Sequence, residues 1–382
     1  MSGDHDDFSP AEYARRDAAV HEFMERDALD ALVIYGSGRA ADVAYLSGWP
    51  GTREAVLVYP READPVLLVQ LFNHVPNAVR LARVRDVRWG GRTIGATTLA
   101  ALLERVARPR RIGLVGGLPW DHYETLRRGL PDDAFTDAAP PLRMLRATKS
   151  AEELERLRIA ARFTDIAMRA LEREVRPGMR EHELVAIVEG SYAREGGTHG
   201  IHFMATTPMR APLIGVPSQL QTARVIERGD VLITEISAEH HGYTGQIHRA
   251  YAIGVEPTDQ YRRIHDVAVE TYERVRDSIR DGSTAADVIA AAEVVHERGF
   301  TIYDDLLHGA SQLPPILKTS RTAHGPTPDF TFRENMIVVV QPNVVTADDG
   351  RVGLQVGETL RVTKTGTERL HDYPMRFIVC AT

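Results

Sequence analysis

The chain has 382 residues, 43% hydrophobic and 26% charged, so it can bury a large core divided over two or three domains. Its formal net charge of −7 argues against a nucleic-acid partner, since neutralising phosphates requires a basic face. Cys380 is the only cysteine, which excludes an internal disulfide and fits a reducing compartment. The acidic, polar start does not resemble a signal peptide, and no apolar run approaches about 18 residues. We therefore expect a cytoplasmic protein without a membrane partner.

The first 146 residues alternate short apolar runs with helical stretches. Ser9, Pro10 and Glu12 form a capping-box signal for a helix that runs to about residue 28. This alternation predicts a mixed sheet with helices packed on it, an α/β domain. Strands are predicted at 31–35, 55–59, 65–70 and 111–116, and helices at 73–84, 95–107 and 119–129.

A domain boundary is predicted within residues 137–150, where prolines interrupt the pattern before a second capping box at Ser150 and Glu153. We expect domains at 1–146 and 147–382. In the second domain, helices that flank a largely antiparallel sheet indicate an α+β fold. Its predicted helices are 151–174, 180–195, 258–281 and 284–297, and its predicted strands include 202–206, a hairpin over 229–254, and 300–306, 336–341, 351–356 and 358–364.

The predicted hairpin carries polar groups inside otherwise apolar strands. Period-two spacing places Glu235 on one face of the first strand, while Gln246 and His248 share a face of the second. Antiparallel pairing would bring a carboxylate, an amide and an imidazole into one patch, which is our candidate active site. The structural alternative is that Glu235 forms a salt bridge to Arg249 or Arg361.

The same hairpin, GDVLITEISAEHHGYTGQIHRAYAIG, resembles the pattern GD-x-V-x-x-D-x-G followed by GY-x-x-D-x-T-R of the creatinase, prolidase and methionine-aminopeptidase superfamily. The segments KSAEELERLRIAARFTDIAM, VRPGMREHEL and LHG are similar to further motifs of its catalytic domain, and ADVAYLSGW to its amino-terminal domain. This resemblance implies a creatinase-type α/β amino-terminal domain followed by an α+β pita-bread (creatinase/aminopeptidase-like) carboxy-terminal domain.

The resemblance also implies which positions would hold two metal ions in the metallopeptidases. Those positions carry Glu235, Gln246, His308, Gln341 and Gly357 in this chain. A pair of hard divalent ions needs several anionic oxygens, and two amides and a glycine supply none. We therefore expect a member without metal or other cofactor, closest in type to creatinase.

In creatinase a glutamate precedes the hairpin arginine, and His248 takes its place here. The resemblance thus assigns proton transfer to His248 and His308, and the orientation or activation of water to Glu235. A lone histidine at position 308 would otherwise be a structural residue. The catalytic histidine of the family falls near Ser218, so either His202 compensates for it or the alignment slips in this proline-rich loop.

The remaining predicted site residues would bind a small-molecule substrate that carries a carboxylate. An aromatic and an arginine, Trp49 and Arg53, match a family pattern in which the amino-terminal domain of one subunit completes the active site of the other, so we expect a homodimer. The predicted substrate-binding residues are Arg53, Trp49, His202, Tyr243, Gln246, Arg321, Gln341 and Gln355.

These observations favour a metal-independent, creatinase-like enzyme acting on a C–N bond by histidine and glutamate acid–base catalysis. A lyase, cyclase or decarboxylase with the same fold is an alternative, as is an inactive pseudoenzyme that binds a peptide or protein. A metal-dependent Xaa-Pro peptidase ranks last, because so few metal ligands remain.

Overall fold

The computed structural model describes residues 8–38, 41–51 and 53–380. The chain divides into two compact units, Met1–Arg146 and Ala147–Thr382, each described by itself below. Within the described ranges, no helix has the length and apolar character needed to cross a membrane.

The first unit is built on a six-stranded sheet of order β4-β3-β2-β1-β5-β6. Its strands are β1 (Ala31–Gly36), β2 (Ala55–Pro60), β3 (Val66–Val69), β4 (Asp86–Trp89), β5 (Ile112–Val115) and β6 (Phe135–Asp137). The sheet is mixed, because β1 pairs antiparallel with β2 and parallel with β5. Its helices are α1 (Pro10–Arg26), α2 (Ala41–Ser47), α3 (Val75–Leu81), α4 (Ile94–Arg105), α5 (Trp120–Gly129) and α6 (Ala139–Ala147). Short 3-10 turns span Phe72–His74 and Asp132–Ala134.

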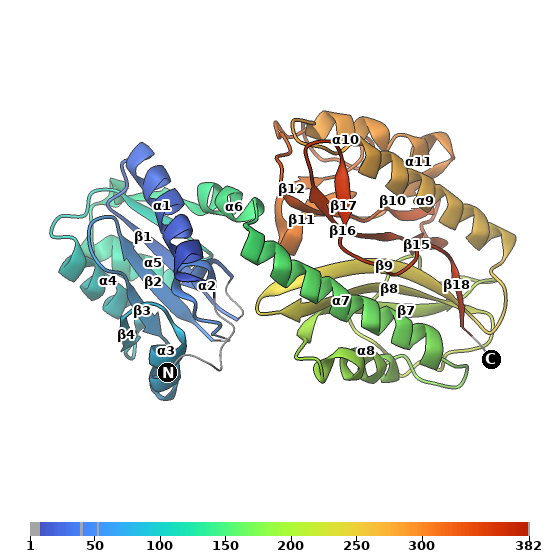
Figure 1. The fold of residues 1–382 in the computed structure, drawn as a ribbon, viewed down its shortest axis with the longest axis horizontal. Helices are drawn as coiled ribbons and strands as arrows, with labels where there is room; N and C mark the ends of the chain where they lie inside the picture. The colour runs from blue at the N-terminus through green and yellow to red at the C-terminus, as the bar shows by residue number, and fades with distance from the viewer. Residues whose placement is uncertain (1–7, 39–40, 52, 381–382) are drawn as a thin grey trace. The chain divides into compact units, whose positions relative to one another are not determined.

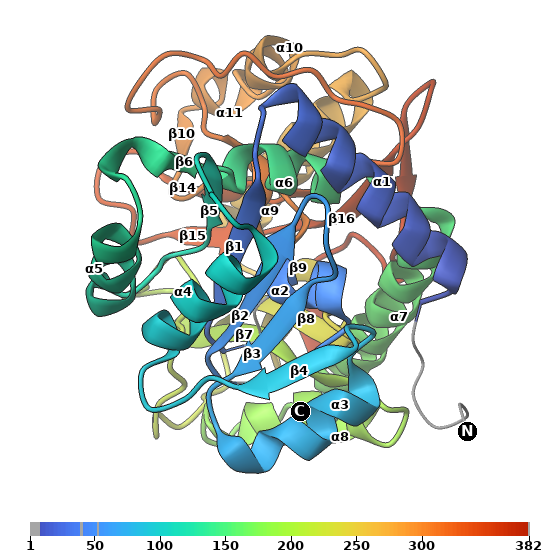
Figure 2. The ribbon, with the colours of Figure 1, turned by 90° about the vertical axis from the view of Figure 1, so that its left-hand side faces the viewer.

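The central strand β1 is buried on both faces, as its uninterrupted apolar run requires. Leu32 and Ile34 join a core that includes residues of α1, α2 and α6, whereas Ala31 and Val33 join a second core with residues of α4 and α5. Figure 2 shows α1 on one side of this sheet and α4 and α5 on the other. The predicted α/β domain is confirmed, with one helical layer on each face.

The segment with the predicted domain boundary contains a helix that the sequence did not predict. Prolines were expected to interrupt the pattern there, but Pro140 and Pro141 lie in the first turn of α6, where a helix needs no amide donor. The carboxylate of Asp137 accepts a hydrogen bond from the amide of Ala139 at 2.9 Å and so marks the start of this helix. The short strands β4 and β6 were also missed, because three or four residues are too few to show a period.

The second unit contains a nine-stranded sheet, in which seven strands follow the order β12-β11-β13-β16-β9-β8-β7 and β17 and β18 pair with β16 and β9. Its strands are β7 (Thr198–Pro208), β8 (Asp230–His240), β9 (Tyr243–Ile253), β11 (Leu307–Gly309), β12 (Leu313–Leu317), β13 (Ile337–Val340), β16 (Gly357–Val362), β17 (Thr367–Arg369) and β18 (Ile378–Cys380). A three-stranded sheet contains β10 (Phe300–Ile302), β14 (Asn343–Thr346) and β15 (Gly353–Gln355). The helices are α7 (Ala151–Glu174), α8 (Glu183–Ala193), α9 (Asp259–Ser278), α10 (Ala285–Ala291) and α11 (Val294–Glu297), with a 3-10 turn at Ala310–Gln312.

Helices cover both faces of the large sheet (Figure 1). Leu232 and Ile236 of β8 pack into a core with α7 and α8, and Val231 and Ile233 pack into a core with α9 and α10. The predicted capping box at the start of α7 is confirmed. Alternate residues of β8 therefore face different helical layers, as expected for a strand with a period of two.

The predicted hairpin is confirmed as β8 and β9. His240 pairs with Tyr243 across a two-residue turn in which His241 and Gly242 both have positive φ, at 47° and 85°. Such turns match the twist of the flanking strands. The resulting register places Glu235 opposite His248, so both side chains lie on the α9 side of the sheet.

Candidate active site

The second unit gathers polar side chains, buried except for the half-buried Glu235, on or next to five strands, and we call this set the polar cluster. It consists of Glu235, Gln246, His248, His308, Gln341 and Gln355. The first three lie on β8 and β9, His308 lies on β11, Gln341 follows β13 directly, and Gln355 ends β15. The residues that the sequence placed in one hairpin patch thus meet others from distant parts of the chain.

The amide of Gln246 is the hub of the polar cluster. Its Nε2 lies 3.0 Å from Oε1 of Glu235, 3.1 Å from Nε2 of His248 and 3.2 Å from Oε1 of Gln341. An amide nitrogen has only two protons, so these three acceptors share two hydrogen bonds.

His308 joins the cluster through Gln341. Its Nδ1 lies 2.8 Å from the carbonyl oxygen of Gly309, and its Nε2 lies 3.2 Å from Oε1 of Gln341. A neutral ring carries one proton, so His308 donates to one of these two oxygens at a time. A continuous chain of contacts thus runs from His308 through Gln341 and Gln246 to Glu235.

Glu235 has the most exposed side chain of the cluster. Its side chain is 13% exposed, whereas His248 and His308 are 0% and 1% exposed. Burial, reinforced by the negative charge of Asp304, raises the pKa of Glu235 to about 7, against a smaller opposing effect of a hydrogen bond with Gln355. At neutral pH this carboxyl group can therefore both accept and donate a proton.

Both histidines of the cluster favour the neutral form. Burial lowers the pKa of His248 well below its ordinary value, and the charges of His308 and Arg249 lower it further. Burial also lowers the pKa of His308, although its hydrogen bonds to Gly309 and Gln341 oppose this. At neutral pH, Glu235 is therefore the residue of the cluster best suited to transfer a proton.

The cationic partners that might have neutralised Glu235 are bound elsewhere. Arg249 pairs with Glu358 at 2.7 Å, and Arg361 pairs with Glu368 at 2.7 Å. The salt bridge considered as the structural alternative for Glu235 is therefore not formed. This leaves burial to dominate the pKa of its carboxyl group.

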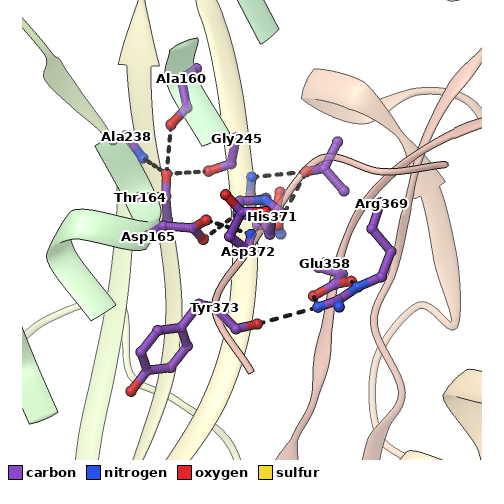
Figure 3. A network of polar contacts seen from close by, with 12 residues as sticks. Ala160, Thr164, Asp165, Ala238, Gly245, Glu358, Arg369, His371, Asp372 and Tyr373 are labelled. Carbon is purple, nitrogen blue, oxygen red and sulfur yellow. Dashed lines mark hydrogen bonds and ion pairs between the residues drawn. The ribbon is translucent and has the colours of Figure 1, made fainter. Parts of the chain in front are cut away.

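A network of polar contacts secures the strands behind the cluster (Figure 3). The hydroxyl of Thr164 in α7 donates to the carbonyl of Gly245 in β9 at 2.6 Å and accepts from the amide of Ala238 in β8 at 3.0 Å. Next to it, Asp165 binds Nδ1 of His371 at 2.9 Å. Helix α7 thus ties the β8–β9 hairpin to the C-terminal segment and holds Gln246 in register.

The donor set does not fit a pair of divalent metal ions. Of the five positions that the resemblance assigns to metal ligands, only those of Glu235 and His308 carry common ligands, because Gln246 and Gln341 use their amides to bind each other and the neighbouring side chains. Gly357 cannot be replaced by a ligand without a backbone shift, because an added Cβ would lie 2.1 Å from the carbonyl oxygen of Val340.

Two predicted substrate-binding residues lie away from the cluster. His202 pairs with Ile236, whose side chain faces α7 and α8, and its Nε2 lies 2.7 Å from the hydroxyl of Tyr192. Tyr243 donates its hydroxyl proton to Glu153 at the start of α7, at 3.0 Å. His202 and Tyr243 were assigned to the site by resemblance, but the pleat of the sheet directs them to the other face.

The remaining predicted site residues lie in a local turn, in an exposed segment and in the first unit. Ser218 donates its hydroxyl proton to the carbonyl of Leu220 in a local turn, at 2.9 Å. Arg321 is exposed in the segment between β12 and β13. In the first unit, Trp49 is buried in the core, while Arg53 is exposed. The role of Arg53 at a subunit boundary stays a prediction.

The sequence reasoning overlooked two acidic residues next to the cluster. Asp304 raises the pKa of Glu235 through its charge, and Asp305 accepts a hydrogen bond from Gln341 at its carbonyl oxygen, at 3.3 Å. Lys318 lies 3.1 Å from the carboxylate of Asp305. The pair shortly precedes the LHG motif, so its position in the sequence was a usable signal.

Comparison with known proteins identifies both parts of the chain. Residues 155–364 match the family model described as metallopeptidase family M24, and residues 16–148 match the creatinase/prolidase N-terminal domain. An uncharacterized hydrolase/peptidase of Sinorhizobium fredii is 27% identical, with 97% of each chain covered. A Xaa-Pro dipeptidase of Pyrococcus horikoshii is 22% identical, with 92% of this chain and 95% of the relative covered. The X-Pro aminopeptidase structure from Thermotoga maritima superposes with a TM-score of 0.81 at 21% identity, covering 95% of this chain and 99% of that chain.

These matches confirm the predicted fold, an α/β amino-terminal domain and a pita-bread carboxy-terminal domain. They contradict the predicted function. We ranked a creatinase-like enzyme first and a Xaa-Pro peptidase last, yet the similar proteins of Pyrococcus horikoshii and Thermotoga maritima are both named as Xaa-Pro peptidases. The ranking was wrong because it rested only on lost metal ligands.

Proposed function

Because the chain belongs to metallopeptidase family M24, we propose that it is an enzyme that hydrolyses a peptide bond in a short peptide, with Glu235 as its catalytic carboxylate. The observation that carries the proposal is the pKa of about 7 at a partly exposed carboxyl group within a buried polar cluster. Relatives named as Xaa-Pro peptidases support peptides as the substrate class.

The proposed reaction uses Glu235 twice. The carboxylate takes a proton from a water molecule while the water oxygen attacks the carbonyl carbon of the substrate. The protonated Glu235 then gives this proton to the leaving amine nitrogen as the C–N bond breaks. The products are a carboxylic acid and an amine, and Glu235 is again ionised. A pKa near neutrality suits both steps, since neither form is strongly favoured.

The remaining cluster residues hold Glu235 in position. Gln246 donates to the carboxylate, and Gln341 and His308 in turn fix Gln246. We assign His308 to positioning rather than to direct proton transfer, because its side chain is almost fully buried behind Gln341. Correct placement of the reacting groups can account for large rate effects by itself.

The function is tested by incubating the purified protein with Xaa-Pro dipeptides and with longer peptides that begin Xaa-Pro. Product amines are quantified in metal-free buffer and, separately, with added Mn²⁺, Co²⁺ or Zn²⁺. Turnover that disappears in Glu235→Gln supports the proposal, and Glu227→Gln, which removes an exposed carboxylate before β8, is the matched control. If neither peptide class is cleaved under any of these conditions, the proposed function is wrong.

Replacing His308 should lower kcat by roughly 10²-fold in His308→Ala while KM changes little, because Gln341 and then Gln246 lose their support. His308→Asn keeps a polar group at this position and should recover part of the rate. Steady-state kinetics with the best peptide substrate measure both values. A purely structural role would instead lower the unfolding midpoint and leave kcat per folded molecule unchanged.

We further propose that the enzyme is a homodimer in which Arg53 of one subunit binds the substrate carboxylate at the other subunit's active site. The guanidinium group can grip a carboxylate at two points, so Arg53→Ala should raise KM more than it lowers stability. Arg53→Lys keeps the charge without the two-point contact and should not restore binding.

Mixing inactive Arg53→Ala chains with inactive Glu235→Gln chains tests the shared site. Random exchange makes about half of the dimers mixed, and each mixed dimer has one intact site, so activity should return to about a quarter of wild type. A monomer in solution, or no recovery after proven subunit exchange, rejects this arrangement.

A further inference from the structure

A second group of potential ligands lies outside the polar cluster. Glu189, His199 and His202 each offer one donor atom, and these atoms all lie within 4.8 Å of one another. Oε1 of Glu189 is 3.0 Å from Nδ1 of His199, and the rings of the two histidines are 4.5 Å apart between centroids. Among the residues that the structure describes, no other group of three histidine, cysteine or acidic side chains is this compact.

A β-bulge brings the two histidines together. Residues three positions apart on a regular strand point to opposite faces. In β7, however, the register shifts at Gly200, so His199 pairs with Ala238 and His202 pairs with Ile236. Ala238 and Ile236 are two positions apart on β8, and the two histidines therefore share a face.

The bulge depends on glycine at position 200. A Cβ added there would lie 2.2 Å from the carbonyl oxygen of Ser237, so another residue would force the strands apart. Helix α8 lies beside β7 and supplies Glu189 (Figure 1). Three ligands thus converge from two elements that are in contact.

We propose that Glu189, His199 and His202 bind one divalent transition-metal ion, such as Zn²⁺, at a site separate from the polar cluster. Two imidazoles and one carboxylate form a ligand set that suits Zn²⁺ and leaves a fourth position open. The side chains of Glu189 and His199 are 41% and 50% exposed, so the open position faces solvent and can hold water.

The hydrogen bonds of His202 favour this role. Its Nδ1 donates to the carbonyl of Ile201 at 2.6 Å, which places the lone pair on Nε2. Ligating histidines commonly donate their second nitrogen to a carbonyl in this way. The hydroxyl of Tyr192 donates a hydrogen bond to Nε2 of His202 at 2.7 Å, so this hydroxyl must turn away when an ion binds.

The site is distinct from the candidate active site. His202 is on the face of the sheet that packs against α7 and α8, whereas Glu235 is on the opposite face. Binding would connect α8 to β7 and stabilise that contact by mass action. Metal binding at this site plays no part in the proposed peptide hydrolysis.

The test is a titration of chelator-treated protein with Zn²⁺, followed by equilibrium dialysis and metal analysis. It is run on the full chain carrying Glu235→Gln, so that a ligand of the active site is already removed. One equivalent should bind, and its affinity should fall more than roughly tenfold in Glu189→Gln and in His199→Ala. His324→Ala removes an exposed histidine elsewhere and should leave binding unchanged.

A second measurement reports on the location of the ion. Zn²⁺ should raise the thermal unfolding midpoint of the parent protein and fail to do so in His199→Ala. Tyr192→Phe removes the competing hydroxyl and should bind at least as tightly as the parent. Absence of a bound equivalent, or equal binding by the parent, Glu189→Gln and His199→Ala, overturns the site and leaves only a surface ion pair between Glu189 and His199.

Discussion

Glu235→Gln should lower kcat/KM for the best peptide substrate by at least about 10²–10⁴-fold while the protein stays folded. Glutamine has nearly the same shape as glutamate and can still accept from Gln246, but it cannot take a proton from water. In the wild-type enzyme the rate should fall below about pH 7, where the carboxylate becomes protonated. Steady-state kinetics over a pH series check both expectations, and near wild-type turnover by the variant would exclude Glu235 as the catalytic carboxylate.

The same variant should be more stable than the wild type at high pH. The pKa of Glu235 rises from 4.5 to about 7 on folding, so the native state holds a proton that the unfolded state has released. Stability therefore falls as pH rises from about 4.5 to 7, by an amount on the order of 3 kcal/mol for this one group. Glutamine stays neutral and avoids that loss. Urea unfolding of both proteins at pH 5 and pH 8 measures this difference in the free energy of unfolding. The gain in stability of Glu235→Gln over the wild type should appear at pH 8 and nearly vanish at pH 5.

The second large effect concerns the buried pair of Arg249 and Glu358. Both side chains are 0% exposed and lie 2.7 Å apart. Tyr272 also donates to Glu358, at 2.9 Å, and Arg369 binds the same carboxylate. Removing one partner with Glu358→Ala should lower the free energy of unfolding by about 3–5 kcal/mol, because the arginine charge is left buried and unpaired. Urea unfolding at neutral pH measures the loss.

A double variant separates the contribution of the ion pair to the free energy of unfolding from the destabilisation caused by an unpaired buried charge. Arg249→Met with Glu358→Leu leaves no buried charge at either position and should recover most of the stability lost in Glu358→Ala. If the double variant is as unstable as the single one, the pair is needed for more than charge compensation.

Acid should weaken this pair in the wild-type protein. Burial opposes ionisation of Glu358, but the hydrogen bond from Arg369 and the charge of Arg249 outweigh it and lower the pKa to about 2. The stability that the carboxylate contributes is therefore present above about pH 4.5 and is lost as pH falls towards 2. The difference in stability between wild type and the double variant should shrink over this range.

The sequence alone determined the local part of the site. Alternation placed Glu235 on one face of β8 and Gln246 with His248 on one face of β9, pairing across the short turn was expected to bring them together, and the register pairs Glu235 with His248. A strand has a period of two whatever surrounds it, so this inference needed no tertiary information. The capping residues Ser9 and Ser150 likewise marked the starts of α1 and α7, because a helix terminus must satisfy its first amides locally.

Only the tertiary structure decided which side chains pair with partners that are distant in the sequence. Arg249 could have paired with Glu235, 14 positions away, but it binds Glu358, 109 positions away, and this choice leaves the pKa of Glu235 near 7. His202 faces away from the cluster because the register of β7 pairs it with Ile236, whose side chain lies on the face that packs against α7 and α8. Periodicity describes a single segment, whereas pairing and burial depend on which segments meet in the folded chain.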